Sequence, residues 1–432
     1  MLPDDVLLVI FYFCVAHVRN QDIILVKVIE LWQSLVHVCR WWWAIIFGSP
    51  HRLNIWLVCT LRRPARQSLD VWLALDLLIK GTISSASANN IIFALGQSVH
   101  VCRVNLVTTG GLQWDKVLAS MQVSFPELTY LDLHSYDETL LVIPDTFLGG
   151  STPRLWYLQL KRISFLGIPK LLLSTTQPVQ FYLLNIPHSR YFSPDAMASC
   201  LSALIHLCFL SLKFLSSQSC PDRESQRPLP LTWCLLPNLT AFWFKGVSGY
   251  LDDLIAWYDA PRLDNLFIKF LHQINFDTPH LVQFISHTLL FGEPDEAVVD
   301  FDVDLTEVWL WSCTSDDYRE LSMKISCRQS DQQIPSITQV CTRCLPPLLM
   351  VENLQVFTKD SNTELDWKDD IKGSKWLELL HPFTAVKSIY LSEEFQPGIT
   401  STLQELVGGR MTEVLPSLQK IFLMRFEPSG PF

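Results

Sequence analysis

The residues of this 432-residue chain whose types and spacing could do chemistry are first of all two cysteines, Cys341 and Cys344. A C-x-x-C pair is half of a structural zinc site or the motif of a thiol redox centre. A zinc site needs a second pair of ligands, and the sequence offers neither another C-x-x-C nor an H-x3-H. The segment 337–345 has a helical pattern that places both thiols on one face, as core residues do. We therefore predict no metal ligands here.

Paired carboxylates are the second candidate, because two acids can divide the roles of general acid and general base. Such pairs occur at Asp4-Asp5, Asp252-Asp253, Asp316-Asp317 and Asp369-Asp370. Adjacent acids at a helix start more commonly interact with the helix dipole or face solvent. No histidine spacing suggests a nucleophile with its base, and no phosphate-binding glycine loop or G-x-S-x-G elbow occurs. We expect no catalysis, no cofactor and no metal.

The composition limits the possible partners. The chain is 49% hydrophobic and only 18% charged, with 33 basic and 43 acidic residues and a net charge of −10. A chain this apolar must bury much surface internally or against a partner, and without a basic run it is not expected to bind nucleic acid or an anionic membrane. The apolar stretch 6–16 is too short to span a bilayer and has an acidic flank where a secretory signal is basic.

The 12 cysteines are scattered along the chain without the spacing of a disulfide framework. Free thiols used as small apolar core residues are typical of a reducing compartment. The expected location is therefore the cytoplasm or the nucleus.

The elements that would position functional groups begin with two helices. Pro3 suits the first helical turn, and Leu7, Ile10, Phe11 and Cys14 follow the i, i+3, i+4, i+7 spacing of one helical face. A second helical stripe runs from Trp32 through Trp42 to Ile46, and Gly48-Ser49-Pro50 ends it.

These two stretches resemble an F-box, most specifically in the Leu-Pro opening and the Val-Cys-Arg-x-Trp core. The residues that carry the resemblance are Leu2, Pro3, Leu7, Ile10, Phe11, Leu35, Val38, Cys39 and Trp42. The resemblance implies that residues 1–55 bind a Skp1-like adaptor through these positions, and through it a cullin ubiquitin ligase. The sequence differs from the compact form by a longer segment at 17–29 and by Trp41 and Trp43, where basic residues are common.

Three consecutive tryptophans, Trp41 to Trp43, allow two interpretations. A helix turns about 100° per residue, so the three indoles cannot all face one core. In one interpretation at least one of them lies at a contact surface. In the other, all three pack against the longer segment and the first repeat.

Beyond residue 100 an apolar-x-x-apolar-x-apolar unit recurs, as in Leu128/Leu131/Leu133 and Leu155/Leu158/Leu160. Further copies start at residues 101, 178, 207, 239, 263, 351, 386 and 418. Leucine-rich repeats of about 20–29 residues have this signature, each with a short strand and a returning helix or loop. Ser193-Pro194-Asp195 and Thr278-Pro279 open helices between the units, and the alternating residues at 299–303 and 321–325 predict strands in the gap.

The expected fold is thus α/β: an F-box-like helical module over 1–55, a helical connector or cap over 56–100, and an irregular leucine-rich-repeat-like α/β solenoid over 101–432. The polar ladder that regular repeats carry at their bends is absent, since apolar side chains such as Ile163 and Leu215 occupy those positions. Residues 216–232 form the most loop-like stretch.

Aromatic residues recur at the positions between the repeat leucines, which would face away from the core. They are Tyr130, Trp156, Tyr157, Tyr182, Phe209, Trp243 and Phe267. Because Trp and Tyr are common in binding hot spots, this row is the predicted target-binding surface. The alternative is a second core, with the row covered by a loop or the C-terminal tail.

Two functions fit these features. The first is a substrate-recognition adaptor that holds a target protein on its repeats and links it through a Skp1-like protein to a cullin ligase, without catalysis of its own. The second is a protein-interaction solenoid scaffold with no ligase link, in which the N-terminal helices only cap the first repeat.

Overall fold

The protein is described from a computed structural model that places sixteen segments of the chain. These are residues 3–16, 38–48, 56–59, 75–108, 113–136, 141–144, 146–165, 174–187, 193–217, 234–273, 276–288, 294–311, 319–327, 329–358, 373–392 and 414–424. The chain divides into two compact units, Met1–Tyr182 and Leu183–Phe432, with the division inside strand β8 (Val179–Ile186). Each unit is described by itself.

Two helices pack together at the start of the first unit. Helix α1 (Asp4–Ala16) carries Asp4 and Asp5 in its first turn, and α4 (Arg40–Gly48) ends at the predicted glycine. The ring centroids of Phe11 and Trp42 lie 4.9 Å apart in an edge-to-face contact. The helical stripe expected from Trp32 is not continuous: Cys39 precedes α4, and its thiol accepts the backbone N–H of Trp42 at 3.4 Å. Of the expected stripe, residues 32–37 lie outside the described segments.

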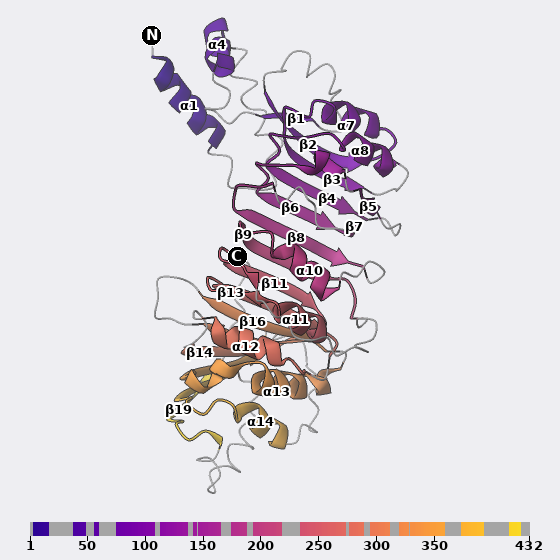
Figure 1. Ribbon diagram of the computed structural model, residues 1–432. Coiled ribbons are helices and arrows are strands. Elements are labelled where there is room, and N and C mark those ends of the chain that lie inside the picture. The colour runs from indigo at the N-terminus through magenta and orange to yellow at the C-terminus, as the bar shows by residue number, and fades with distance from the viewer. Residues whose placement is uncertain are drawn as a thin grey trace. The chain divides into compact units, whose positions relative to one another are not determined.

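Parallel strands form the sheet of the first unit, in the order β1-β2-β3-β4-β6 (Figure 1). Their bounds are Trp56–Cys59, Asp76–Ile83, Val101–Thr108, Tyr130–Ser135 and Tyr157–Lys161. Helices α7 (Ala88–Leu95) and α8 (Trp114–Ser120) connect successive strands and contact each other. A small parallel pair, β5 (Leu141–Ile143) with β7 (Ile163–Phe165), lies beside this sheet.

The segment 56–100 differs from the helical connector that we expected. It holds β1 and β2 as well as α7, and the two strands pair in parallel from Trp56 opposite Asp76 to Cys59 opposite Ile79. The apolar run Leu77-Leu78-Ile79 is buried in full, so it lacks the alternation that identifies a strand with one solvated face. The strand array therefore begins before residue 101.

Most strands of the second unit are also parallel, in the order β9-β11-β13-β16-β15-β14-β17-β18-β19. Their bounds in chain order are Leu207–Phe214 (β9), Ala241–Gly246 (β11), Asn265–Leu271 (β13), Glu296–Phe301 (β14), Leu305–Trp311 (β15), Glu320–Ser326 (β16), Asn353–Thr358 (β17), Ser388–Ser392 (β18) and Lys420–Met424 (β19). A short parallel pair joins β10 (Cys234–Leu235) and β12 (Tyr258–Asp259).

The repeat pattern is interrupted between β13 and β17. Strand β15 is antiparallel to both β14 and β16, while β16 pairs in parallel with β13 and β14 pairs in parallel with β17. The predicted strands at 299–303 and 321–325 correspond to β14 and β16, and β15 between them was not predicted. The gap in the sequence repeat is thus a three-stranded antiparallel meander inside an otherwise parallel sheet.

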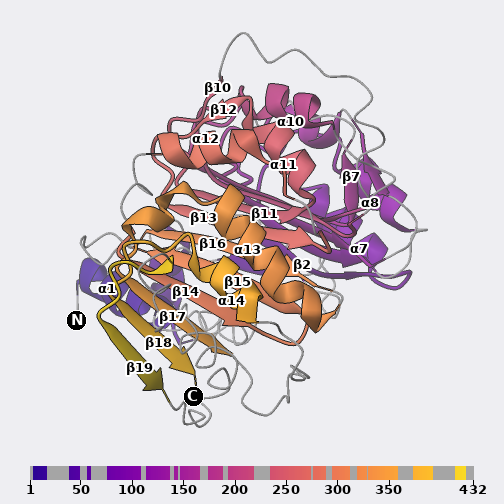
Figure 2. The same cartoon turned by 90° about the horizontal axis from the view of Figure 1, so that it is seen from below.

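Helices follow one another along one side of this second sheet (Figure 2). They are α10 (Pro194–Leu201), α11 (Ser248–Ile255), α12 (Pro279–His287), α13 (Gln333–Arg343) and α14 (Gly373–Leu380), with contacts of α10 to α11, α11 to α12 and α13 to α14. Ser193 caps α10 as predicted, accepting the Ala196 N–H on its side-chain oxygen at 3.2 Å.

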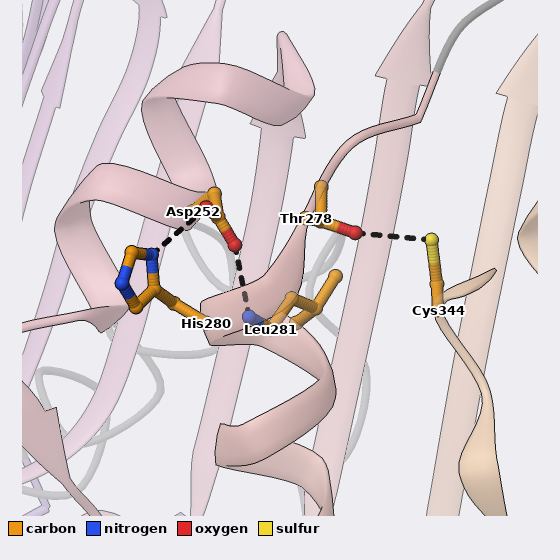
Figure 3. Close-up of polar contacts among 5 residues, drawn as sticks. All are labelled: Asp252, Thr278, His280, Leu281 and Cys344. Atoms are coloured by element: carbon orange, nitrogen blue, oxygen red, sulfur yellow. Dashed lines mark hydrogen bonds and ion pairs between the residues drawn. The ribbon is translucent and has the colours of Figure 1, made fainter.

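The start of α12 is capped differently, as Figure 3 shows. Thr278 occupies the cap position, yet its hydroxyl lies 3.1 Å from Sγ of Cys344 and makes no cap hydrogen bond. The buried carboxylate of Asp252, on α11, takes over this role by accepting the backbone N–H of Leu281 at 2.9 Å. One of the acid pairs in the sequence thus joins two successive helices.

The repeat leucines form the core between each sheet and its helices. Leu131 lies opposite Leu158 and Leu133 opposite Leu160 in the first unit, and all four are buried. In the second unit Leu210, Phe242, Leu266 and Leu321 form one such row. The last repeat is an exception: Ile421 and Leu423 of β19 are exposed, at 42% and 56%. The architecture is therefore mixed α/β, with a large sheet of mostly parallel strands that resembles a leucine-rich-repeat array.

Candidate functional site

The candidate site lies on the outer face of the sheet, which we define as the side chains that alternate with the buried repeat leucines and point away from the helices. On β4, for example, Leu131 and Leu133 are buried, whereas Tyr130, Asp132 and His134 are half-buried. All seven aromatic residues predicted to bind a target are likewise half-buried. The structure gathers them into two clusters, one in each unit.

The first aromatic cluster consists of Tyr130, Trp156, Tyr157 and Tyr182. Tyr130 and Tyr157 stand opposite each other on β4 and β6, and their rings stack with centroids 4.2 Å apart. Tyr182 lies 5.0 Å from Tyr157, and Trp156 packs edge-on against both Tyr130 and Tyr157. Arg103, opposite Tyr130 on β3, places its guanidinium 5.8 Å from that ring. This is a rigid aromatic surface beside a cation.

A polar row runs next to this cluster. Asn105, Asp132 and Gln159 lie in register on β3, β4 and β6. Asp132 accepts hydrogen bonds from the Asn105 amide at 3.2 Å and from the Gln159 amide at 2.9 Å, and the Tyr157 hydroxyl donates to Gln159 at 3.0 Å. Burial raises the pKa of Asp132, while the Gln159 hydrogen bond acts in the opposite direction. The network holds Tyr157 in place rather than offering a nucleophile.

His134 lies two residues beyond Asp132 on β4 and belongs to a third row of outer-face side chains. It lies opposite Lys161 on β6, and its ring centroid is 4.0 Å from that of Tyr136. Burial, with the positive charges of Lys161 and Arg162, lowers the pKa of His134 to about 4. The imidazole is therefore neutral at neutral pH.

The second aromatic cluster consists of Phe209, Trp243 and Phe267 on β9, β11 and β13. Trp243 lies between the other two rings, with centroids 5.2 Å from Phe209 and 5.3 Å from Phe267, both edge-to-face. Trp243 and Phe267 are directly opposite each other in the parallel register. The ammonium of Lys213 lies 4.8 Å from the centroid of the Trp243 ring.

A row of four lysines runs beside this cluster and was not predicted. Lys213, Lys245, Lys269 and Lys324 lie directly opposite one another on the adjacent parallel strands β9, β11, β13 and β16. Burial and the charge of Lys245 lower the pKa of Lys213, and burial and the charge of Lys269 lower the pKa of Lys245. The sequence signal is a lysine directly after the last apolar residue of three successive repeat units, as in Leu212-Lys213, Phe244-Lys245 and Ile268-Lys269.

The lysine row ends at a buried acid on the antiparallel strand β15. Glu307 is opposite Lys324, and its Oε2 forms an ion pair with the Lys324 ammonium at 2.7 Å. Its other oxygen accepts the Ser322 hydroxyl at 2.6 Å. The Lys324 ammonium also lies 5.6 Å from the ring centroid of Trp309. This pair neutralises one end of the row.

The residues of the F-box resemblance divide into buried and exposed sets. Leu7 and Phe11 are buried, and Trp42 is half-buried against Phe11. Pro3, Ile10, Val38 and Cys39 are exposed, and Leu2 and Leu35 lie outside the described segments. Of the three tryptophans, Trp43 is 50% exposed, whereas Trp41 and Trp42 are half-buried; the longer segment at 17–29 lies outside the described segments.

The remaining chemical candidates from the sequence are the cysteine pair and three of the acid pairs. Cys341 is buried in α13 and Cys344 follows the helix, where burial raises the pKa of the Cys344 thiol to about 11. Among the described residues no group of three or more His, Cys, Asp or Glu could hold a metal ion. Asp4 and Asp5 are exposed, whereas Asp316-Asp317 and Asp369-Asp370 lie outside the described segments. No helix of the described segments has the length and apolarity needed to cross a bilayer.

Comparison with known proteins adds little to this description. No protein-family model matches the chain. No curated protein matches it either. Among solved structures, the leucine-rich repeat-containing protein LegL7 from Legionella pneumophila is similar over 87% of this chain and 94% of its own, at 12% identity and a TM-score of 0.27. At that score the superposition supports no inference about function, and the repeat architecture rests on the strand register described above.

Proposed function

We propose that this protein is a non-catalytic interaction scaffold that binds a target protein on the outer face of its sheet. The observation that carries the proposal is the placement of the seven aromatic residues. Six of the seven lie on strands, and their rings touch those of neighbouring strands in two half-exposed clusters. Rigid aromatic side chains that remain partly accessible are the residue type most enriched in binding hot spots.

We further propose that the N-terminal helices make this scaffold a substrate-recognition adaptor of the Skp1–cullin–F-box type. Support comes from the F-box-like residues and from the apolar surface of α1, where Val6, Val9 and Ile10 are 41%, 54% and 42% exposed while Leu7 and Phe11 are buried. A helix with apolar side chains on both its packed and its solvent sides has an unused binding face. The rival is a scaffold without a ligase link, whose helices only cap the array.

A measurement of direct binding to a purified Skp1-type adaptor distinguishes the ligase adaptor from the scaffold without a ligase link. The double variant Pro3→Ala/Ile10→Ala alters two exposed positions, so it should leave α1 folded and abolish adaptor binding in calorimetry. A control, Lys116→Ala, changes an exposed residue of α8 and should bind as the wild type does. Wild-type binding by the double variant, or no binding by the wild type, would leave only the scaffold.

The target itself can be sought by affinity capture with the full chain and with a chain that lacks residues 1–55, followed by mass spectrometry. A target held by the repeats is retained by both, whereas the adaptor and the ligase subunits are lost with the N-terminal helices. Loss of every partner in the truncated chain would contradict a binding site on the sheet.

A further inference from the structure

The lysine row is a positively charged surface on a protein whose net charge is negative. The chain carries a net charge of −10, yet Lys213, Lys245, Lys269 and Lys324 stand side by side on four adjacent strands. Neighbouring strands are about 4.8 Å apart, so the row extends about 14 Å across the sheet. Glu307 pairs with the last lysine, and among the described residues no carboxylate forms an ion pair with the other three.

Such a row is unfavourable for the isolated fold. Like charges directly opposite each other on neighbouring strands destabilise a sheet. Burial lowers the pKa of both Lys213 and Lys245, and the charge of the neighbouring lysine in the row lowers each of them further. An anion placed over the row would remove this repulsion and would gain several charge-assisted hydrogen bonds at once. The arrangement therefore favours a bound state over the free one.

The second aromatic cluster lies directly beside the lysine row, on the same strands. Trp243 precedes Lys245 by two residues and Phe267 precedes Lys269 by two, so each pair lies on the same face about 6.6 Å apart. The ligand that fits both features has negative groups and an apolar or aromatic side chain next to them.

Resting on the proposed function, we propose that the second unit binds an extended acidic peptide segment of the target, with its carboxylates on the lysine row and an apolar side chain against Trp243 and Phe267. In an extended peptide, alternate side chains are about 6.6 Å apart, so acids at three alternating positions span about 13 Å. That length matches the lysine row, which a peptide crossing the strands would follow.

Nucleic acid fits these features less well. A duplex presents a charge about every 1.7 Å and its binding proteins contact many phosphates over a long basic surface. Here the basic surface ends after four residues at Glu307, and the net charge of −10 repels a polyanion at longer range. A short acidic peptide needs only the row itself.

The test uses the full chain and a labelled twelve-residue probe peptide with glutamates at three alternating positions and a tryptophan beside the middle one. Binding is followed by fluorescence anisotropy. A second peptide has glutamine for each glutamate, and a single-stranded oligonucleotide of similar length is the third probe. The variant Lys245→Gln/Lys269→Gln removes two charges from the row. Lys116→Gln/Lys387→Gln removes two charges elsewhere, at exposed positions of α8 and before β18.

We expect the acidic peptide to bind the wild type and the control variant alike, and the row variant about tenfold more weakly. The row variant should melt no earlier than the wild type, because it has less repulsion, and Lys245→Arg/Lys269→Arg should retain binding. Equal binding of the glutamine peptide, undiminished binding by the row variant, or tighter binding of the oligonucleotide would overturn the proposal.

Failure of the acidic-peptide proposal can be distinguished from failure of the proposed function. If an identified target loses affinity with Trp243→Ala but not with Lys245→Gln/Lys269→Gln, the outer face binds the target and only the acidic-segment proposal fails. If the acidic probe peptide binds the row but no target depends on Trp243, the proposed target surface fails instead.

Discussion

The carboxylate of Asp252 accepts the backbone N–H of Leu281 at 2.9 Å, so a residue within one helix caps the next helix along the chain. The second oxygen of Asp252 lies 3.0 Å from Nδ1 of His280, and the aspartate is only 3% exposed. In a repeat array each helix packs only on its neighbours, so such a contact links the stability of successive repeats.

Replacing this cap should destabilise the protein. Asp252→Ala leaves the first turn of α12 without its acceptor and is expected to lower the free energy of unfolding by about 1–3 kcal/mol. Asp252→Asn keeps one acceptor oxygen and should lose less. Urea unfolding followed by circular dichroism measures both, with Asp115→Ala, at an exposed first-turn position of α8, as the control. Equal losses for Asn and Ala would show that the cap contributes nothing.

Truncating Trp243 should affect binding more than folding. The indole is half-buried and lies between Phe209 and Phe267 on the outer face. Trp243→Ala should weaken the binding of an identified target by roughly 2 kcal/mol or more, as for a hot-spot residue. The comparison is Leu212→Ala, which empties a fully buried core position on β9 and should cost about 2–5 kcal/mol of stability. An unchanged affinity for Trp243→Ala would place the target elsewhere.

The positions of these residues could be predicted from the sequence, but not their neighbours across the sheet. The repeat Leu-x-x-Leu-x-Leu marks which side chains are buried, so Trp243 and Phe267 could be assigned to the outer face. Lys213, Lys245 and Lys269 occupy equivalent positions of successive repeat units, but that they stand directly opposite one another depends on strand register, and Lys324 lies outside the repeat units. Strand direction is equally hidden, because parallel and antiparallel strands share the same alternation. Strand β15 was missed for a different reason: its polar residues Thr306 and Glu307 are buried, so it lacks the alternation of apolar and polar residues.

Lys324 should matter for stability in a way that Lys269 does not. Both belong to the lysine row, but only Lys324 forms an ion pair with the buried Glu307. Lys324→Ala leaves a buried carboxylate without its cation and should cost about 3 kcal/mol, whereas Lys269→Ala relieves repulsion and should cost little. Thermal melting of the two variants checks this, and similar melting points would mean that Glu307 does not require its partner.

The stability of the first unit should depend on the protonation of His134. Its folded pKa of about 4 lies below the ordinary value of 6.5, so the unfolded chain binds more protons between these two values. Stability is therefore retained above pH 6.5 and lost as the pH falls towards 4. As the pH falls over that range, the melting temperature of His134→Gln should decrease less than that of the wild type. The control His381→Gln, which changes an exposed histidine after α14, should show the same decrease as the wild type. Parallel curves for all three proteins would contradict the assignment.

The antiparallel meander β14-β15-β16 has a consequence for the order in which the second unit folds. Each parallel pairing joins residues distant in the chain, such as Leu266 with Leu321 or Val299 with Val356, and must first close a long loop. The β14-β15 hairpin needs only the short connection between Phe301 and Leu305, and hairpins form within about 1–10 μs. We therefore expect the sheet of the second unit to nucleate at the interruption in the repeat pattern, with β13 and β17 adding on either side. Pulse-labelling hydrogen exchange during refolding should find the amides of β14 and β15 protected before those of β18, and the reverse order would refute it.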